Sequence, residues 1–406
     1  MAEKPVYLDP VWPWPGREDV WEFCALLDGD AAPGSKARLV GGAVRDALLG
    51  VAASDIDIAT THLPEQVQEI AKAAGIKTIP TGIDHGTVTA SLESGPVEVT
   101  TLRRDVSTDG RRATVAFSDD WREDAARRDF TFNALYTEAE TGKVHDYFGG
   151  MDDLKAGRLV FIGNASDRIK EDYLRILRLF RFYARFGGEP LDPDLLDLCR
   201  EMGPSLKGLS RERISSELLR LLVADAPLEA MQAMAQADLW QHILPEMSVG
   251  GFALFQRLLN RASEHGVTAH GMTRLAALLP LERKTMDRVA ARLRLSNADR
   301  DKLRQLTALS QEDWSSFKKL SYRFGCNGVM QAALLIGDDE NYESVIAGLR
   351  NWIPPKFPIA GRDLLALGLA SGPEVGKTLR ALEERWIALD FPETDDPEAF
   401  IRANLP

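Results

Sequence analysis

A strand, a glycine turn, a helix and a second strand are predicted in close succession near the start of the chain. Residues 38–40 have the pattern of the end of a short buried strand, and Gly41-Gly42 indicates a tight turn. Residues 43–49 then have the pattern of a helix that Gly50 ends. A short loop leads to Asp55-Ile56-Asp57, which begins the next predicted strand. This order predicts a mixed α/β unit.

Asp55 and Asp57 flank the apolar Ile56, and alternate residues of an extended chain point to the same side about 6.5 Å apart. Both carboxylates can therefore face one pocket while Ile56 packs into the core. Carboxylates bind Mg²⁺, and two such ions about 3.5–4 Å apart can clamp the attacking and leaving oxygens of a displacement at phosphorus. A solvated turn is the alternative interpretation, because Asp is common in loops.

The glycine pair upstream favours the metal-and-phosphate interpretation. Gly42 has no side chain, so the backbone can approach phosphate oxygens closely, and the helix that follows points free N–H groups at the same place. Arg45 lies in the first turn of this helix and can add a charged bidentate contact. The combination makes nucleotidyl transfer the leading hypothesis.

Four further segments follow in order, namely 127–135 (RRDFTFNAL), 146–154 (DYFGGMDDL), 171–182 (EDYLRILRLFRF) and 210–217 (SRERISSE). With residues 39–57 they resemble five motifs of the class II tRNA nucleotidyltransferase and bacterial poly(A) polymerase family, which has a polymerase-β-like fold. The resemblance implies an α+β protein. A small nucleotidyltransferase head with a mixed sheet and helices would be followed by an all-α neck, body and tail.

We expect four parts along the chain. They are an N-terminal extension over residues 1–36 with a helix near 18–27, a catalytic head over 37–147, a helical neck for nucleotide selection over 148–225, and a helical body and tail for tRNA binding over 226–406. Amphipathic stretches such as 272–281 and 286–295 mark the last part. Ser210 is expected at a helix N-cap.

The resemblance implies a role for each matching position of the head. Asp55 and Asp57 would bind metal ions, and Gly42 and Arg45 would contact the triphosphate. Arg128 would bind the incoming nucleotide. By apolar pattern alone, the aromatic and aliphatic residues of the same motif would be core, namely Phe130, Phe132 and Leu135.

The resemblance also implies that Asp172 and Arg175 form an amino-acid template that hydrogen bonds the Watson–Crick edge of CTP or ATP. They lie three apart, so on a helix surface they would brace each other. Arg178 and Arg181 continue the row, but the helical repeat of 3.6 residues turns it sideways, so a phosphate or tRNA contact is expected for Arg181. From spacing alone, a solvated ion-pair ladder is the alternative.

A third carboxylate is expected at Glu98, in a strand-like run over residues 96–103. Val97 and Val99 would pack inward, while Glu98 would face the site if this strand adjoins the one with Asp57. An ordinary exposed Glu is the open alternative. Residues 106–120 show neither the periodicity of a helix nor that of a strand, and they predict a mobile loop over the site.

The net charge of −12 is unusual for a protein that binds RNA, so local basic charge must make the contacts. Residues 168–185 supply it through Arg168, Lys170, Arg175, Arg178, Arg181 and Arg185. The three cysteines form no CxxC pair, which argues against a zinc site or a disulfide framework and fits a reducing compartment. Neither a signal pattern nor a membrane span is recognised, so we expect a cytoplasmic protein without a membrane partner.

The sequence thus predicts an Mg²⁺-dependent transferase. The 3′-hydroxyl of a tRNA would attack the α-phosphate of CTP or ATP, release pyrophosphate and build the CCA end. A poly(A) polymerase or an enzyme that adds only C or only A would share every head motif. A non-catalytic RNA-binding protein on a transferase scaffold is the more distant alternative.

Overall fold

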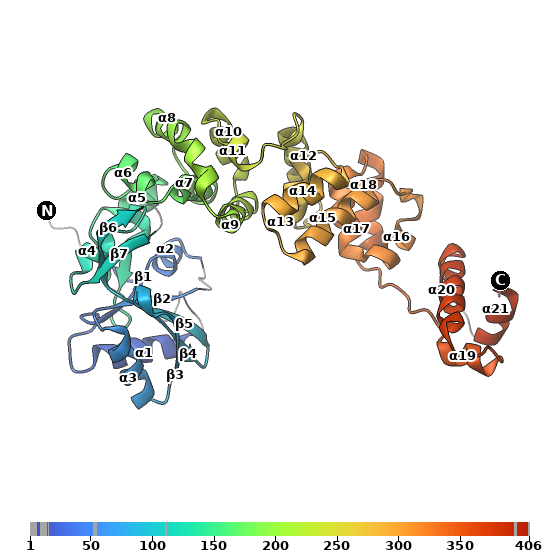
Figure 1. Cartoon of the computed structure of the whole chain (residues 1–406), viewed down its shortest axis with the longest axis horizontal. Coiled ribbons are helices and arrows are strands. Elements are labelled where there is room, and N and C mark those ends of the chain that lie inside the picture. Colours follow the sequence, from blue (N-terminus) through green and yellow to red (C-terminus); the bar gives the residue numbers. More distant parts are fainter. Residues whose placement is uncertain are drawn as a thin grey trace. The chain divides into compact units, whose positions relative to one another are not determined.

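The computed structural model describes residues 6–8, 14, 16–51, 55–109, 112–393 and 396–404. The chain divides into two compact units, residues 1–245 and 246–406, and each is described by itself (Figure 1). Unit 1 contains all the strands and the first eleven α-helices, and the α-helices of unit 2 follow from α12 onward.

A seven-stranded sheet forms the head within unit 1, with the strand order β3-β4-β5-β2-β1-β8-β9. The strands are β1 (Ala37–Val40), β2 (Asp57–Thr60), β3 (Lys77–Gly82), β4 (Thr87–Leu92), β5 (Gly95–Thr101), β8 (Leu135–Thr137) and β9 (Val144–Asp146). Strands β2 and β5 pair in parallel, and the remaining neighbours are antiparallel. The mixed sheet confirms the predicted fold class.

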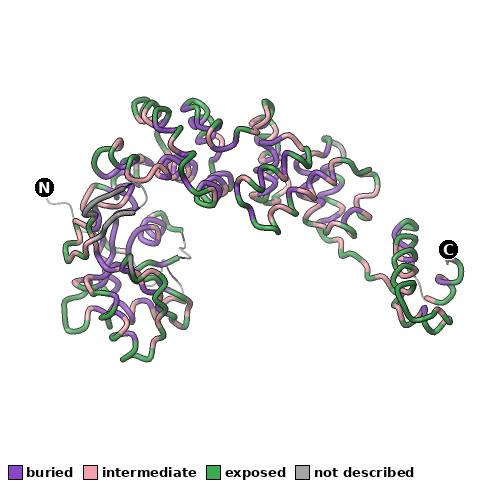
Figure 2. Tube along the Cα trace, in the orientation of Figure 1, coloured by how far each residue is buried: buried purple, intermediate pink, exposed green. Residues whose placement is uncertain are grey.

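Helices pack against the strands, and two of them, α1 and α2, lie where the sequence predicted helices. Helix α1 (Glu18–Asp28) contacts β1 and α3 (Pro64–Ala73), and α3 in turn contacts β3, β4 and β5. Helix α2 (Gly42–Leu48) follows the glycine turn and contacts β1 and β8. Buried residues run along the central strands (Figure 2), where Leu39, Ile58 and Val88 are fully buried.

The prediction of a mobile loop over residues 106–120 was wrong for the part that the structure describes, which excludes residues 110 and 111. Strands β6 (Arg103–Asp109) and β7 (Arg112–Phe117) pair as a separate antiparallel ribbon, and α4 (Trp121–Ala126) follows. A ribbon outside the main sheet is held by its backbone ladder and does not require alternation between apolar and polar residues. The Asp109-Gly110 dipeptide was the available signal, since it is typical of hairpin turns.

The part of unit 1 that follows β9 is helical and includes the predicted neck, residues 148–225. It consists of α5 (Gly150–Ala156), α6 (Ala165–Glu171), α7 (Leu174–Phe186), α8 (Pro193–Met202), α9 (Arg211–Leu222), α10 (Pro227–Gln236) and α11 (Trp240–Ile243). Helix α7 buries Ile176, Leu179 and Phe180 and packs on α9 and α10. Ser210 occupies the N-cap position of α9, as predicted, although its side chain makes no capping hydrogen bond.

An aromatic cluster joins this neck to the head. Phe130 and Phe132 are buried, and their rings lie 5.4 and 5.3 Å from the ring of Phe182 on α7, in edge-to-face geometry. Such pairs contribute about 0.5–1.5 kcal/mol beyond the area they bury. The predicted core role of Phe130, Phe132 and Leu135 is confirmed, and the cluster holds the motif of residues 127–135 against α7.

The regular elements of unit 2, within its described residues, are helices. Its α-helices are α12 (Gly251–Glu264), α13 (Gly271–Ala277), α14 (Arg283–Arg292), α15 (Asn297–Leu309), α16 (Phe317–Phe324), α17 (Cys326–Ile336), α18 (Asp339–Leu349), α19 (Gly361–Ala366), α20 (Pro373–Ala388) and α21 (Pro397–Asn404). The last three pack around a small core of Ile359, Leu364, Leu382 and Ile401. None of the helices in the described residues is long and apolar enough to span a membrane.

Candidate active site

The glycine turn connects β1 to α2 and adopts a conformation that favours glycine. Gly41 has φ 75° and ψ −125°, and its N–H donates to the carbonyl of Leu135 on β8 at 3.0 Å. A Cβ atom at this position would lie 3.4 Å from Nη1 of Arg128. The missing side chain therefore permits both the left-handed turn and the close approach of an arginine.

Arg45 is buried beneath this turn, where several groups hold its guanidinium. Nε donates to Oδ1 of Asp46 at 2.9 Å, and Nη1 donates to Oδ1 of Asn133 at 2.6 Å. The guanidinium also lies 4.8 Å from the centre of the Phe186 ring. Arg45, the predicted triphosphate contact, is thus a cation that its neighbours hold in place.

Asp57 and Glu98 occupy partner positions on the parallel strands β2 and β5. Val97 and Val99 are buried while Glu98 is exposed, which confirms the predicted alternation and the adjacency of the two strands. Desolvation by the surrounding protein raises the pKa of Asp57 to about 6, and the carboxylates of Glu98 and Asp55 add to the shift. Mutually repelling carboxylates of this kind suit a divalent cation.

Asp55 lies just before β2, is exposed and lines the same pocket as Asp57. Among the described residues no group of three or more His, Cys, Asp or Glu side chains forms a complete metal site. Mg²⁺ is commonly held by one or two carboxylates together with substrate phosphates and water. Asp55 and Asp57 fit that kind of site.

Arg128 is anchored by a buried carboxylate that the sequence interpretation missed. Its Nη2 donates to Oδ2 of Asp124 at 3.1 Å, and the hydroxyl of Tyr136 donates to the same oxygen at 2.7 Å. Arg127 lies 2.7 Å from the other oxygen of Asp124. The available signal was spacing, because Asp124 precedes the two arginines at i,i+3 and i,i+4 along α4 and its end.

All four arginines on α7 are paired with carboxylates. Arg178 donates to Oδ2 of Asp129 at 2.6 Å, and Nε of Arg181 lies 2.6 Å from Glu217 on α9. Arg185 lies 3.1 Å from Asp46. The excess positive charge predicted for this helix is therefore largely balanced by acids that come from other parts of the fold.

The prediction that Asp172 and Arg175 brace each other was wrong. Oδ2 of Asp172 accepts from Arg213 of α9 at 2.5 Å, whereas Nη1 of Arg175 donates to Glu171 at 2.5 Å. The reason is a break in the helix: Asp172 has φ −154° and ends α6, so it does not share a continuous helix surface with Arg175 on α7. Asp172 therefore pairs with α9, whereas Arg175 of α7 reaches back across the break to Glu171 of α6.

Two neighbouring pockets surround these groups. The arginine pocket, of about 520 Å³, is lined by Gly41, Gly42, Arg45, Asp57, Arg127, Arg128, Asp129, Asn133, Asp172, Leu174, Arg175, Arg178, Arg181, Phe182, Arg213 and Arg220. The carboxylate pocket, of about 600 Å³, is lined by Gly42, Arg45, Asp46, Asp55, Asp57, Arg181, Arg185, Arg220, Val223, Ala224 and Asp225. Every residue predicted to bind a nucleotide lines the arginine pocket, and both predicted metal ligands line the carboxylate pocket.

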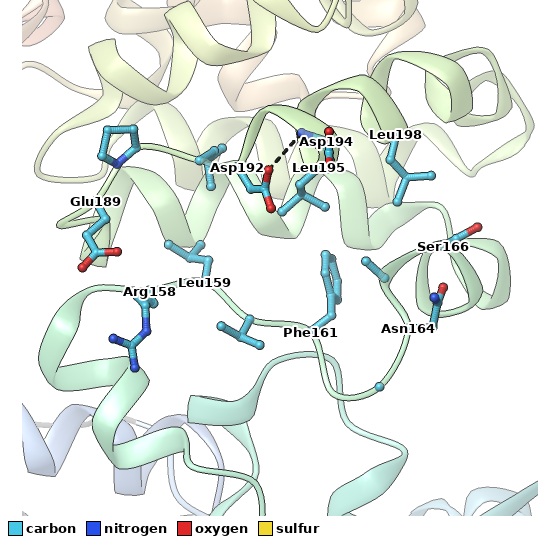
Figure 3. Close-up of a pocket in the computed structure, with 15 residues that line it drawn as sticks. Arg158, Leu159, Phe161, Asn164, Ser166, Glu189, Asp192, Asp194, Leu195 and Leu198 are labelled. Atoms are coloured by element: carbon cyan, nitrogen blue, oxygen red, sulfur yellow. Dashed lines mark hydrogen bonds between the residues drawn. The ribbon is translucent and has the colours of Figure 1, made fainter.

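A third cavity, of about 520 Å³, lies between residues 158–166 and the start of α8 (Figure 3). Phe161, Leu195 and Leu198 contribute apolar lining, and Oδ1 of Asp192 accepts from the N–H of Asp194 at 3.0 Å. None of the predicted site residues lines this cavity. The two pockets beside Asp57 are therefore the candidate active site.

Comparisons with known proteins identify the family of the chain. The model of the poly A polymerase head domain matches residues 37–160, and that of the probable RNA and SrmB-binding site of polymerase A matches residues 190–249. Mitochondrial CCA tRNA nucleotidyltransferase 1 from Danio rerio is 37% identical over 364 residues, which cover 86% of this chain and 83% of that protein. The CCA-adding enzyme of Streptococcus sanguinis is 32% identical over 373 residues, covering 89% of this chain and 92% of that enzyme.

Solved structures show the same fold. The CCA-adding enzyme of Bacillus stearothermophilus in complex with CTP has a TM-score of 0.69 at 24% identity, covering 96% of this chain and 97% of that one. The Thermotoga maritima CCA-adding enzyme complexed with tRNA_CCA has a TM-score of 0.64 at 23% identity, covering 96% and 95%. With relatives above 30% identity over most of its length, the chain belongs to the CCA tRNA nucleotidyltransferase family.

Proposed function

We propose that the protein adds C and A nucleotides to the 3′ end of tRNA from CTP and ATP, without a nucleic-acid template and with release of pyrophosphate. The relatives that share about a third of its residues are CCA-adding enzymes. The observation that carries the proposal is the arginine pocket, which brings the glycine turn, Arg128 and the Asp172 region together beside Asp57.

Binding of the incoming nucleotide is the first task of this pocket. Arg45 is already fixed by Asp46 and Asn133, so it can receive phosphate oxygens without reorganising. Arg128 is held in the same way by Asp124 and Tyr136. Donors positioned in advance stabilise the negative charge that develops on the leaving pyrophosphate.

Asp55 and Asp57 would hold Mg²⁺, with Glu98 beside them as the third carboxylate. When bound, the ions supply Lewis-acid stabilisation of the phosphates and favour the ionised form of the attacking hydroxyl. The metal-ligand assignment predicts that Asp57→Asn or Asp55→Asn abolishes nucleotide incorporation while tRNA binding and the circular dichroism spectrum remain. Asp197→Asn, a change at an exposed residue of α8, is the matched control. Normal turnover of both variants would contradict the assignment.

Base selection would use Asp172 and Arg175, which line the arginine pocket together with Arg178 and Arg181. A carboxylate offers only acceptors and a guanidinium only donors, so the two can read opposite groups on a Watson–Crick edge. Their present partners, Arg213 and Glu171, would hold them in place or release them as the base enters.

A poly(A) polymerase is the second candidate, because the matched head model carries that description. The deciding assay offers CTP or ATP singly to tRNAs that lack CCA, CA or A. We expect CTP to extend the first two substrates and ATP to extend only the third. Long runs of A on any end would instead identify a poly(A) polymerase, and incorporation of only one of the two nucleotides would identify a C-only or A-only enzyme.

We also propose that the helical part beyond the neck binds the body of the tRNA by shape and phosphate contacts. The model described as a probable RNA-binding site matches residues 190–249, which span the end of the neck and the start of this part, and this overlap supports the role. A cytoplasmic location remains a prediction from the three free cysteines, and a mitochondrial protein is among the relatives.

A further inference from the structure

We propose that the carboxylate pocket receives the 3′-terminal nucleotides of the acceptor RNA, and that Arg220 contacts a phosphate of this RNA strand. The inference rests on the proposed function and adds the location of the second substrate. It also gives a role to Arg220, which was not among the predicted site residues.

The first step comes from the geometry of the reaction. Two substrates must meet beside the carboxylates, because the attacking hydroxyl and the α-phosphate react only from about 3–3.5 Å. The predicted base-selecting and nucleotide-binding groups, including Arg128, Asp172 and Arg175, line the arginine pocket. A nucleotide held there leaves the other side of Asp57 for the acceptor strand.

The second step comes from how the two pockets divide the site. They share Gly42, Arg45, Asp57, Arg181 and Arg220, whereas Asp55 lines only the carboxylate pocket. The carboxylate pocket has about 600 Å³ of space, within the range of roughly 300–1,000 Å³ that is typical of ligand sites. It therefore has room for a terminal nucleotide next to both predicted metal ligands.

The third step is the charge balance of the carboxylate pocket. Arg45 and Arg185 both pair with Asp46, and Arg181 pairs with Glu217. Arg220 is exposed, and no carboxylate among the described residues forms an ion pair with it. Its guanidinium is therefore available to a phosphate of an incoming strand, for which arginine offers a bidentate donor.

The fourth step is the support behind Arg220. It lies in the last turn of α9, where Leu218, Leu221 and Leu222 are buried. The same helix contributes Glu217, which binds the α7 arginines. Arg220 thus extends from a helix that packing and ion pairs hold in place. Its contact with a phosphate of the RNA strand would therefore have a fixed geometry.

The test uses the full-length protein, a tRNA that lacks only its terminal A, and ATP. For Arg220→Gln we expect the KM for tRNA to rise about 10- to 100-fold, the loss typical of one charge-assisted hydrogen bond, with the KM for ATP unchanged. Arg220→Lys should raise the KM for tRNA less than Arg220→Gln does, because lysine keeps the positive charge but lacks the bidentate donor geometry of the guanidinium. Lys72→Gln, at an exposed residue on α3, is the charge-matched control and should leave both constants unchanged.

A second measurement is the salt dependence of tRNA binding without ATP. The slope of log K against log salt should fall by about one for Arg220→Gln, as expected when one phosphate contact is removed. A raised KM for ATP with an unchanged KM for tRNA would show that Arg220 contacts the nucleotide and would overturn the proposal. The proposal would also fail if neither KM changed in Arg220→Gln. Failure of the wild-type protein to incorporate any nucleotide would instead refute the proposed function itself.

Discussion

Asp124→Asn should weaken the fold and the nucleotide site together. The Asp124 side chain is 1% exposed and binds Arg127 at 2.7 Å, Arg128 at 3.1 Å and the Tyr136 hydroxyl at 2.7 Å. Asparagine keeps the shape but removes the charge, so two arginines lose their counter-ion in a buried place. Breaking such a pair costs about 3–5 kcal/mol. Because an amide oxygen can still accept one hydrogen bond, we expect a loss of about 3 kcal/mol in the free energy of unfolding.

The pH dependence provides an independent estimate of the same interaction. Burial alone would raise the pKa of Asp124, but the charges of Arg128 and Arg127 and the hydrogen bond from Tyr136 outweigh it and lower the pKa from 3.8 to about 2. A depressed pKa stabilises the folded state above the unfolded value and loses this effect as the pH falls through the folded value. At 1.36 kcal/mol per unit, the contribution is about 2 kcal/mol near pH 7. It should disappear between about pH 4 and pH 2.

Urea denaturation of wild type and Asp124→Asn at several pH values measures both quantities. The difference in unfolding free energy should be about 3 kcal/mol at pH 7 and shrink as the pH falls from 4 toward 2. Asp197→Asn, whose side chain is 68% exposed in its pair with Arg200, should change stability by less than about 1 kcal/mol. A difference between Asp124→Asn and wild type that stays constant with pH would refute the ion-pair reasoning.

Three further changes test other parts of the site. Gly41→Ala should destabilise the protein by about 1 kcal/mol or more, because alanine tolerates φ 75° poorly, and thermal unfolding would show it. Glu217→Gln should lower the free energy of unfolding by about 1–3 kcal/mol, because the buried carboxylate pairs with arginines of α7; an unchanged chemical denaturation curve would argue against this. Arg213→Gln should alter the ratio of CTP to ATP incorporation, since Asp172 loses its partner, and the single-nucleotide assay reads this ratio directly.

Local sequence patterns were sufficient for the glycine turn and for the strand with Glu98. The turn depends on a backbone conformation that glycine adopts readily, and Val97 and Val99 alternate with Glu98 because a strand exposes its two faces in turn. The residues predicted to bind the nucleotide line one pocket. The β6–β7 ribbon was missed because its sequence shows neither the helical nor the strand periodicity.

Only the tertiary structure decided which charged groups meet. Asp172 pairs with Arg213, and Arg178 pairs with Asp129, across separations that no helical or strand period predicts. Asp124 meets Arg127 and Arg128 at helical spacing, but the Tyr136 hydroxyl that binds the same carboxylate comes from β8. Sequence periodicity reports which face of an element is buried, whereas the choice of an ionic partner depends on the elements packed against that face. For this protein the sequence therefore determined the residue types and motif order of the site, and the packing of α7 against α9 and the head determined its charge geometry.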